Sequence, residues 1–322
     1  MQKVIYDTDP GVDDAMALLF LENHPDIDLV GITTVFGNAY IEETTNNALF
    51  LKREWNIAAP VAKGAGQHFE PNRVSHIPPR AIHGPTGLGP IINPDVTGLE
   101  TDPRDAPQFI IDTVRAHPHE IVIVAVGRMT NLANALSRDP GIASLVKQVV
   151  VMGGAFDHRG NVTPAAEANI HGDPEAADKA FTAPWPVVLI GLNITHQTSM
   201  TRAELASIAE ATGARGKLLN DLSQEYFDFY DRIGDDSFEG MIVHDSCAAV
   251  YAAAPELFET RSGPVRVVCG GIADGQTIQM DERIGFGMAD DWRPFPSQKV
   301  VTGIDAPAVL KVLRETLLLV KS

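Results

Sequence analysis

The chain has 322 residues, of which 44% are hydrophobic and 21% charged, and its formal net charge is −17. This composition is typical of a globular protein with a sizeable core, and the acidic excess argues against nucleic acid or anionic membrane surfaces as partners, since both require basic patches. Two cysteines are too few for a disulfide framework, and the chain has neither a signal-peptide pattern nor a membrane-length apolar run, so we expect a cytoplasmic protein.

The first predicted strand, Val4–Tyr6, leads into the most distinctive segment of the chain. Residues 7–14 contain four aspartates and precede an apolar, helix-like stretch that begins at Ala15. The acidic loop therefore follows the carboxyl end of a strand, where open α/β sheets bind ligands. Carboxylates so close together repel one another and raise their own pKa values, a conflict that a hard cation such as Ca²⁺ relieves. Helix capping explains one or two of the aspartates but not four.

Other templates fit this loop poorly. An EF-hand counted from Asp7 needs Gly and Glu where the chain has Val12 and Leu18. No Gly-x-x-x-x-Gly-Lys-Ser/Thr run of a P-loop occurs. A phosphatase of the aspartyl-phosphate type also places two aspartates one residue apart, but it does not predict the Pro-Gly-x-Asp-Asp that follows here.

Further along the chain, apolar runs alternate with helical patterns. The helical patterns lie near 106–114 and 306–317, and the predicted strands are Leu29–Val35, Ile121–Val126, Gln148–Met152, Val187–Leu192 and Val265–Cys269. The alternation predicts a doubly wound, mostly parallel sheet flanked by helices, in a single α/β domain over 1–322. Two stretches, near 64–104 and 231–243, depart from it and are expected to be active-site loop insertions, with plain surface loops as the alternative.

Taken together, the motifs resemble the nucleoside hydrolase family of the inosine–uridine-preferring type. They occur in the family's order and cover nearly the whole chain, at residues 7–15, 35–38, 82–84, 127–131, 151–154, 160–161, 166–169, 173–177, 195–196 and 243–245. The resemblance implies a Rossmann-like core and Ca²⁺-dependent hydrolysis of the N-glycosidic bond of ribonucleosides. The products would be ribose and a free purine or pyrimidine base, as in nucleoside catabolism and salvage, and the enzyme would be a homodimer or homotetramer.

The resemblance also implies a site. Ca²⁺ would be bound by Asp9, Asp14, Asp245 and the backbone carbonyl of Val126, with Asp9 as general base and His244 as the acid that protonates the leaving base. The expected substrate contacts are Asp13, Asn38, His83, Met152, Asn161, Glu167 and Asn169. Capping for Asp14 and an ion pair for Asp245 are the alternative interpretations.

Some points stay open. Ala168 stands where relatives usually have an aromatic residue, which leaves the surroundings of the sugar's 5′ end undetermined. Base preference depends on loop residues expected around Phe227–Gly240, and His171 and His196 are expected to be structural. Two alternative functions remain, an N-ribosyl hydrolase for a nonstandard nucleoside and a non-catalytic, metal-stabilised protein that binds nucleosides or sugars.

Overall fold

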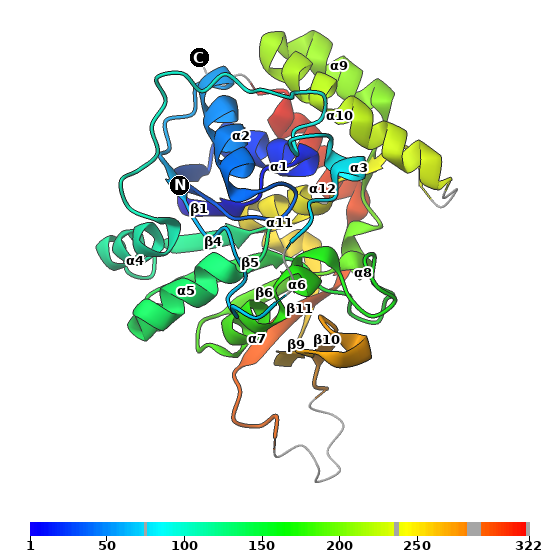
Figure 1. Ribbon diagram of the computed structural model, residues 1–322. Coiled ribbons are helices and arrows are strands. Elements are labelled where there is room, and N and C mark those ends of the chain that lie inside the picture. The colour runs from blue at the N-terminus through cyan, green and yellow to red at the C-terminus, as the bar shows by residue number, and fades with distance from the viewer. Residues whose placement is uncertain (74–75, 235–237, 282–290, 320–322) are drawn as a thin grey trace.

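A nine-stranded sheet with helices on both faces organises the computed structural model, which describes residues 1–73, 76–234, 238–281 and 291–319 (Figure 1). Residues 74–75 and 235–237, which belong to the two predicted insertions, lie outside the described residues. The strands are β1 (Gln2–Thr8), β2 (Ile27–Thr34), β3 (Val61–Lys63), β4 (Ile121–Ala125), β5 (Gln148–Met152), β6 (Val187–Ile190), β7 (Ser199–Met200), β8 (Met241–Ile242), β9 (Phe258–Val267), β10 (Thr277–Gln279) and β11 (Ser297–Ile304).

The helices are α1 (Val12–Asn23), α2 (Ile41–Glu54), α3 (Arg80–His83), α4 (Ala106–Ala116), α5 (Thr130–Arg138), α6 (Ala168–Gly172), α7 (Pro174–Thr182), α8 (Leu192–Thr195), α9 (Arg202–Thr212), α10 (Ala214–Ile233), α11 (His244–Ala253) and α12 (Ala306–Leu317). Short 3₁₀ turns occur at η1 (Pro140–Ser144), η2 (Pro255–Leu257) and η3 (Gly271–Ala273).

The sheet has the strand order β10-β9-β11-β6-β5-β4-β1-β2-β3. The strands from β3 through β1 and β4 to β11 run parallel, and β9 and β10 add an antiparallel edge. The order reverses direction between β1 and β4, because β2 and β3 extend the sheet one way and β4 to β6 the other. The predicted doubly wound, mostly parallel fold is therefore confirmed, and the reversal lies beside the acidic loop, as expected for a ligand site.

Side chains of the central strands alternate between two apolar cores. In β1, Val4 and Tyr6 face the core shared with α1, α10, α11 and α12, whereas Ile5 faces the core shared with α4, α5 and α7. In β4, Val124 faces the first of these cores and Ile123 faces the second. Burial on both faces accounts for the continuous apolar runs by which these strands were predicted.

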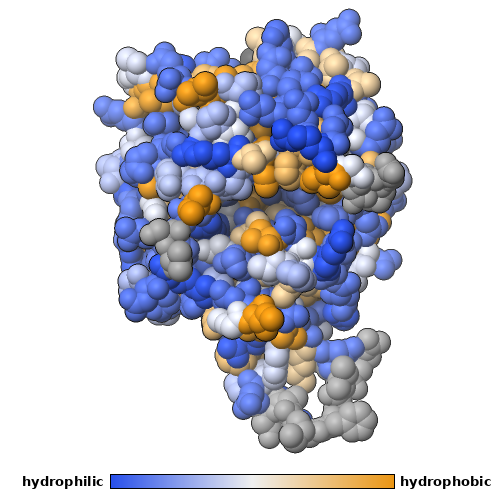
Figure 2. Space-filling view, turned by 45° about the vertical axis from the view of Figure 1, so that its right-hand side comes forward, coloured by the Kyte–Doolittle hydropathy of each residue, from blue (hydrophilic) through white to orange (hydrophobic). Residues whose placement is uncertain are grey.

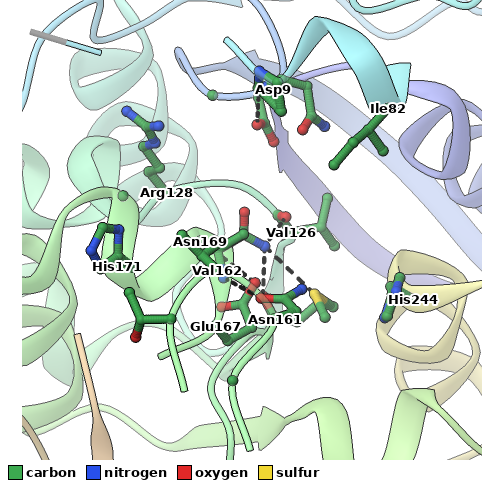
Figure 3. A pocket seen from close by; sticks show the side chains of 18 of the residues that line it. Asp9, Ile82, Val126, Arg128, Asn161, Val162, Glu167, Asn169, His171 and His244 are labelled. Atoms are coloured by element: carbon green, nitrogen blue, oxygen red, sulfur yellow. Dashed lines mark hydrogen bonds between the residues drawn. The ribbon is translucent and has the colours of Figure 1, made fainter. Parts of the chain in front are cut away.

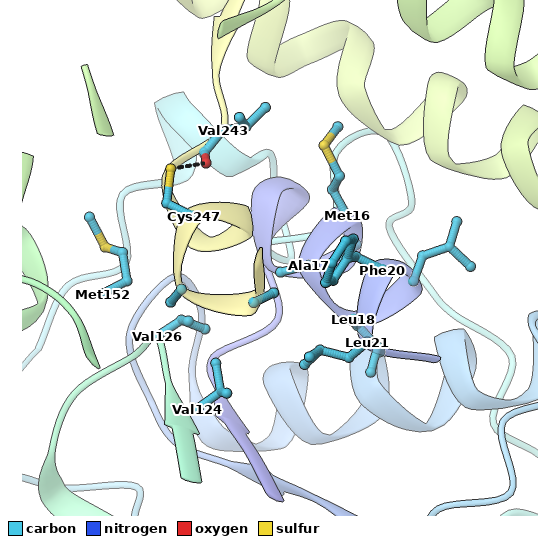
Figure 4. Close-up of a cluster of buried hydrophobic side chains, with 14 of the residues drawn as sticks. Met16, Ala17, Leu18, Phe20, Leu21, Val124, Val126, Met152, Val243 and Cys247 are labelled. Atoms are coloured by element: carbon cyan, nitrogen blue, oxygen red, sulfur yellow. Dashed lines mark hydrogen bonds between the residues drawn. The ribbon is translucent and has the colours of Figure 1, made fainter. Parts of the chain in front are cut away.

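Helix α11 lies beside α1 on the same face of the sheet, almost wholly enclosed (Figure 4). Met16 and Phe20 of α1 belong to the same core as Cys247 of α11 and Val124 of β4. Both helices are buried nearly all round, which makes their hydrophobicity uniform rather than striped. Their close packing sets the first turn of α11 against the first turn of α1.

Several elements differ from their predictions. Helix α1 begins at Val12 rather than at Ala15, so that Asp13 and Asp14 lie in its first turn. The expected loop around Phe227–Gly240 is wrong in its first part, because α10 continues to Ile233. The predicted strand Val265–Cys269 is the end of the longer β9, which stops at Val267.

The face drawn in Figure 2 is mostly hydrophilic, with hydrophobic residues scattered over it rather than gathered in one broad area. Within the described part of the chain, none of the helices combines the length and apolarity needed to traverse a bilayer. Cys247, which is buried, and Cys269, which is exposed, are both free thiols.

A glycine in β2 offers a test of the packing between the sheet and α4. A Cβ atom added at Gly31 would lie 2.2 Å from the ring of Phe109. Because this ring is buried, we expect Gly31→Ala to destabilise the protein by about 1–3 kcal/mol in urea unfolding, and Phe109→Leu in the same chain to recover part of that loss. Gly141→Ala, at an exposed glycine of η1, is the control and should change stability by less than about 0.5 kcal/mol. Additive effects of the Gly31 and Phe109 changes would contradict the assigned contact.

Candidate active site

A cavity of about 1650 Å³ opens at the carboxyl ends of the central parallel strands. Asp9 follows β1, Asn38 follows β2, and Val126 follows β4, while His244 and Asp245 begin α11. Figure 3 shows His244 on one side of the cavity and Arg128 with His171 on the other, with Asp9, Asn169 and Glu167 between them. Residues far apart in the sequence thus meet where the strand order reverses.

The loop between β1 and α1 is held by its own carboxylates. Asp14 accepts hydrogen bonds from Thr8 Oγ1 at 2.5 Å, from Gly11 N at 2.9 Å, and from the side chain of Asn38 at 2.9 Å. Asp9 Oδ2 accepts the backbone N–H of Asn38 at 2.7 Å. The loop after β2 is thereby fixed to the loop after β1.

Asp7, in contrast, turns away from the cavity. Its Oδ1 accepts hydrogen bonds from Thr33 Oγ1 at 2.5 Å and from Asn131 Nδ2 at 2.7 Å. Asn131 also donates to the carbonyl of Thr34 at 2.9 Å, so it links β1, β2 and α5. Of the four aspartates in the loop, Asp7 therefore braces the fold, and Asp9, Asp13 and Asp14 remain near the cavity.

The carboxylates of Asp13, Asp14 and Asp245 come together, with one oxygen of each lying within 4.8 Å of the others. All three are buried, and so is Asp9, whose Oδ1 has no hydrogen-bond partner. The described residues that line this cavity include no lysine, and one of the arginines among them, Arg128, interacts with Asp9 electrostatically. The positive charge available from the described side chains is thus smaller than the negative charge gathered here.

Burial and mutual repulsion raise the pKa values of this cluster. Burial is the main cause at Asp9, Asp13 and Asp245, and the charge of a neighbouring aspartate adds to it, so that the pKa of Asp13 rises to about 8. Asp14 is raised less because it accepts the hydrogen bonds of Thr8 and Gly11. Ionising all four carboxylates together is costly unless a cation joins them.

The donor set fits a hard divalent ion. Such ions take oxygen ligands from carboxylates and carbonyls, and the orphaned oxygen of Asp9 together with the Asp13, Asp14 and Asp245 cluster supplies oxygens of this kind. The carbonyl of Val126, at the end of β4, accepts the Asn169 side chain at 2.7 Å and keeps a second lone pair. Asp13, predicted only as a substrate contact, is thus itself a member of the carboxylate cluster.

His244, directly before Asp245 at the start of α11, lies in an aromatic wall of the cavity. Its Nδ1 is 2.7 Å from Thr195 Oγ1 and its Nε2 is 3.0 Å from the hydroxyl of Tyr230. Burial, with smaller contributions from His196 and His83, lowers the pKa of His244 to about 3, so the imidazole is uncharged at neutral pH. Both ring nitrogens have a hydroxyl partner that can exchange a proton with them.

The remaining predicted contacts divide between the two ends of the cavity. His83, at the end of α3, stacks on Tyr226 of α10 with ring centroids 5.2 Å apart, on the side of His244. Asn161 and Glu167 lie on the other side of the centre, where the Glu167 carboxylate accepts the backbone N–H groups of Gly154, Asn169 and Ile170. Asn169 donates to the carbonyl of Met152 at 3.2 Å.

Sequence reasoning missed part of this cavity. His171 and His196, expected to be structural, both line it, and the ring of His196 lies 5.7 Å from that of His244. Tyr226 and Tyr230 were not singled out, although their spacing of four residues is a helical signal. Arg128 bonds His76 at 2.7 Å and stacks on Phe36 at 4.2 Å, contacts for which the sequence carries no local signal.

The comparisons with known proteins agree with this geometry. A family model for the inosine-uridine preferring nucleoside hydrolase matches residues 4–311. The chain is 37% identical to a probable uridine nucleosidase 2 of Arabidopsis thaliana, over 98% of both chains. It is 36% identical to an inosine-uridine preferring nucleoside hydrolase of Leishmania major, over 86% of this chain and 87% of the other. A solved purine-preferring ribonucleoside hydrolase from Gardnerella vaginalis matches with a TM-score of 0.89 and 32% identity, over 98% of each chain.

The raised pKa values lead to a prediction for stability. Carboxyls with a folded-state pKa above that of the unfolded chain stabilise the protein at low pH, and this stabilisation is lost as the pH rises through the folded values. With the pKa of Asp7 raised from 3.8 to about 6 and that of Asp13 from 3.8 to about 8, mainly by burial, we expect the Tm in chelator to fall between about pH 4 and pH 8.

A divalent cation should oppose this loss. A cation that binds only the folded state adds about 2.7 kcal/mol when present at a hundred times its Kd. We expect calorimetry to show a higher Tm with cation at pH 8, a response that Asp245→Asn abolishes. Asp157→Asn, at an exposed carboxylate with a positive φ, should keep the response. A parent protein whose Tm ignores divalent cations would contradict the metal site.

Proposed function

The chain belongs to the inosine-uridine preferring nucleoside hydrolase family and is a nucleoside hydrolase that acts on ribonucleosides, and from this premise we propose that it is Ca²⁺-dependent and uses Asp9 and His244 as its catalytic pair. The observation that carries the proposal is that one cavity holds both kinds of group this reaction needs. A cluster of buried carboxylates lies beside His244, whose two ring nitrogens are each bonded to a hydroxyl.

The proposed Ca²⁺ ligands are Asp9, Asp14, Asp245 and the Val126 carbonyl, with Asp13 close enough to the cluster to contribute. When bound there, Ca²⁺ would acidify a ligated water and hold the vicinal hydroxyls of the ribose. Asp9 suits the role of general base because its Oδ2 is fixed by the Asn38 N–H, while its Oδ1 is buried and unpaired.

At the other end of the bond that breaks, the departing base needs a proton. His244 is uncharged in the free protein, so it acts as an acid only after it takes up a second proton, which the Tyr230 hydroxyl can pass to Nε2 while it receives one in turn from Tyr226. Tyr230 bonds His244 and lies 3.3 Å from the hydroxyl of Tyr226, so a short line of hydroxyls leads to the imidazole. Proton transfer of this kind contributes about 10²–10⁴-fold to rate.

Sugar and base would be recognised differently. Asp13, Asn38 and Asn169 offer oxygens and an amide to the ribose hydroxyls, and a site built to pair hydroxyls rejects analogues that lack them. The base would lie among rings, chiefly His83, Tyr226 and Tyr230. Aromatic stacking accepts purines and pyrimidines alike, and the names of the relatives cover both classes. We therefore propose broad base acceptance with 2′- and 3′-hydroxyl selectivity.

Loss of the general base should abolish turnover. We expect Asp9→Asn to lower kcat for uridine and inosine by about 10³-fold or more, because the amide can neither accept the proton nor neutralise the cation. Reducing-sugar release measures this, and chelator should remove the activity of the parent until Ca²⁺ is restored. Activity that survives exhaustive chelation would refute the dependence on Ca²⁺. Absence of turnover for every nucleoside, together with tight ribose binding, would instead favour a binding protein.

Protonation of the leaving base by His244 can be tested by comparing substrates that need this proton with one that does not. We expect His244→Ala to lower kcat/KM for uridine or inosine by about 10²-fold or more and to spare 4-nitrophenyl riboside, whose leaving group needs no proton. His117→Ala, at a histidine that does not line the cavity, is the matched control. Equal losses on both substrates would remove leaving-group protonation from His244.

A further inference from the structure

The aspartate proposed as general base is enclosed by the loops of the two strands next to its own. Strand β1 pairs with β2 on one side and with β4 on the other, so the loops after these strands flank Asp9. A Cβ atom added at Gly37, after β2, would lie 1.8 Å from Asp9 Oδ2, and one added at Gly127, after β4, would lie 2.5 Å from Asp9 Oδ1. The carboxylate therefore lies in a slot between two glycine backbones, which we name the Asp9 slot and define by Gly37 and Gly127.

The Asp9 carboxylate has few bonds of its own. Its Oδ2 accepts the backbone N–H of Asn38 at 2.7 Å, whereas its Oδ1 has no hydrogen-bond partner among the described residues. The position of the carboxylate thus depends on how far apart the two flanking loops lie. Because loops move more than the strands they follow, a fixed position for Asp9 requires a contact that joins the loop after β2 to the loop after β4.

The residues beside the two glycines make this contact. Phe36 directly precedes Gly37, and Arg128 directly follows Gly127. The guanidinium carbon of Arg128 lies 4.2 Å from the centroid of the Phe36 ring, well within the roughly 6 Å over which a cation is attracted to an aromatic face. Phe36 is 1% and Arg128 8% exposed, and such a contact is stronger where water is excluded. The two loops are thereby joined across the end of β1.

Neighbouring side chains fix both partners of this contact. Arg128 Nη2 donates to His76 Nδ1 at 2.7 Å, since a guanidinium offers only donors. A Cβ atom added at Gly172, the last residue of α6, would lie 2.4 Å from Arg128 Nε, so the helix packs directly against the guanidinium. The Phe36 ring meets His68 and His76 edge to face, with centroids 5.1 and 5.5 Å away. Neither partner can move far without displacing a packed neighbour.

Two other roles for Arg128 fit its surroundings less well. A substrate anion bound to it would lie close to Asp9 and Asp173, whose charges already interact with Arg128 and would repel that anion. A purely structural role in the core is also unfavourable, because burying a guanidinium has a desolvation cost that an aliphatic side chain avoids. A buried arginine at this position therefore calls for a function in the site.

From these contacts we infer that Arg128 and Phe36 form a clamp that positions Asp9 for the reaction. The inference rests on the proposed function, in which Asp9 takes the proton of the attacking water. Arg128 is a positioning residue, since it acts through the Phe36 ring and the two glycine backbones of the Asp9 slot. Misplacing a reacting group by about 1 Å can cost about 10²-fold in rate. Loosening the clamp should therefore lower kcat and leave KM nearly unchanged.

Kinetics on the Ca²⁺-loaded enzyme test the clamp from both sides. Arg128→Gln removes the cation, whereas Phe36→Leu removes the ring and leaves the charge in place. We expect each to lower kcat for uridine or inosine by about 10–100-fold with KM within about threefold of the parent, and the double variant to lose no more than about twice what the worse single variant loses. Hydrolysis of 4-nitrophenyl riboside should fall by the same factor, because it needs the base although it needs no leaving-group proton.

The matched control is a second contact of the same kind. The guanidinium of Arg104 lies 4.8 Å from the ring centroid of Phe109, and neither residue lines the cavity. We expect Arg104→Gln to keep kcat and KM within about twofold of the parent.

Amide exchange in the calcium-free protein gives a readout that needs neither metal nor turnover. The Asn38 N–H is bonded to Asp9 only while the loop after β2 stays in place. We expect hydrogen–deuterium exchange, followed by mass spectrometry, to be at least about tenfold faster for the Asn38 amide in Arg128→Gln and in Phe36→Leu. Exchange in α12, which does not line the cavity, should stay unchanged and shows that the chain remains folded.

The outcomes separate the clamp from its alternatives. Normal kcat and normal Asn38 exchange in Phe36→Leu would overturn the inference, because only the charge of Arg128 would then matter. A raised KM at unchanged kcat in Arg128→Gln would also overturn it, since Arg128 would then bind substrate. A parent enzyme without Ca²⁺-dependent turnover would refute the proposed function instead, and the exchange experiment would still decide whether the clamp holds Asn38 against Asp9. Should Arg128→Gln fail to fold, Phe36→Leu decides the question by itself.

Discussion

The structure depends on bringing together carboxylates that repel one another. Asp9, Asp13, Asp14 and Asp245 are all buried, and their pKa values are raised by that burial and by their neighbours. Apolar packing between α1 and α11 opposes the repulsion, since it joins the N-terminal turns of two helices that are far apart in the chain. The folded chain therefore holds four carboxylates whose mutual repulsion a bound divalent ion would relieve. Binding affinity for that ion and stability of the folded chain are two measures of the same arrangement.

The proposed chemistry separates along the cavity. Oxygen ligands and the proposed base lie at the ends of the parallel strands, where the backbone is fixed by the sheet and by the hydrogen bonds of Asp14 and Asn38. The proposed acid lies on α11, and its imidazole is held between Thr195 and Tyr230. The sugar would lie between these groups, so that water is activated on one side and the leaving base on the other.

Much of this could be predicted from local sequence patterns. The central strands are apolar on both faces, and the aspartates directly after β1 marked the site before any contact was known. The strand β11 escaped prediction because its two valines lie in an otherwise polar segment. The helix α10 mixes acidic and aromatic residues, and the loop expected around Phe227 was wrong for that reason. The contacts of Arg128, His171 and His196 depend on residues distant in the sequence, which no local periodicity encodes.

The aromatic wall proposed to receive the base comes largely from α10, which pairs with α9 at the periphery of the molecule (Figure 1). Two of its tyrosines also reach the reacting groups, since Tyr226 interacts with Asp13 and Tyr230 bonds His244. A substitution in this peripheral helical hairpin would therefore act at once on the space for the base and on the hydroxyl that holds the imidazole of His244.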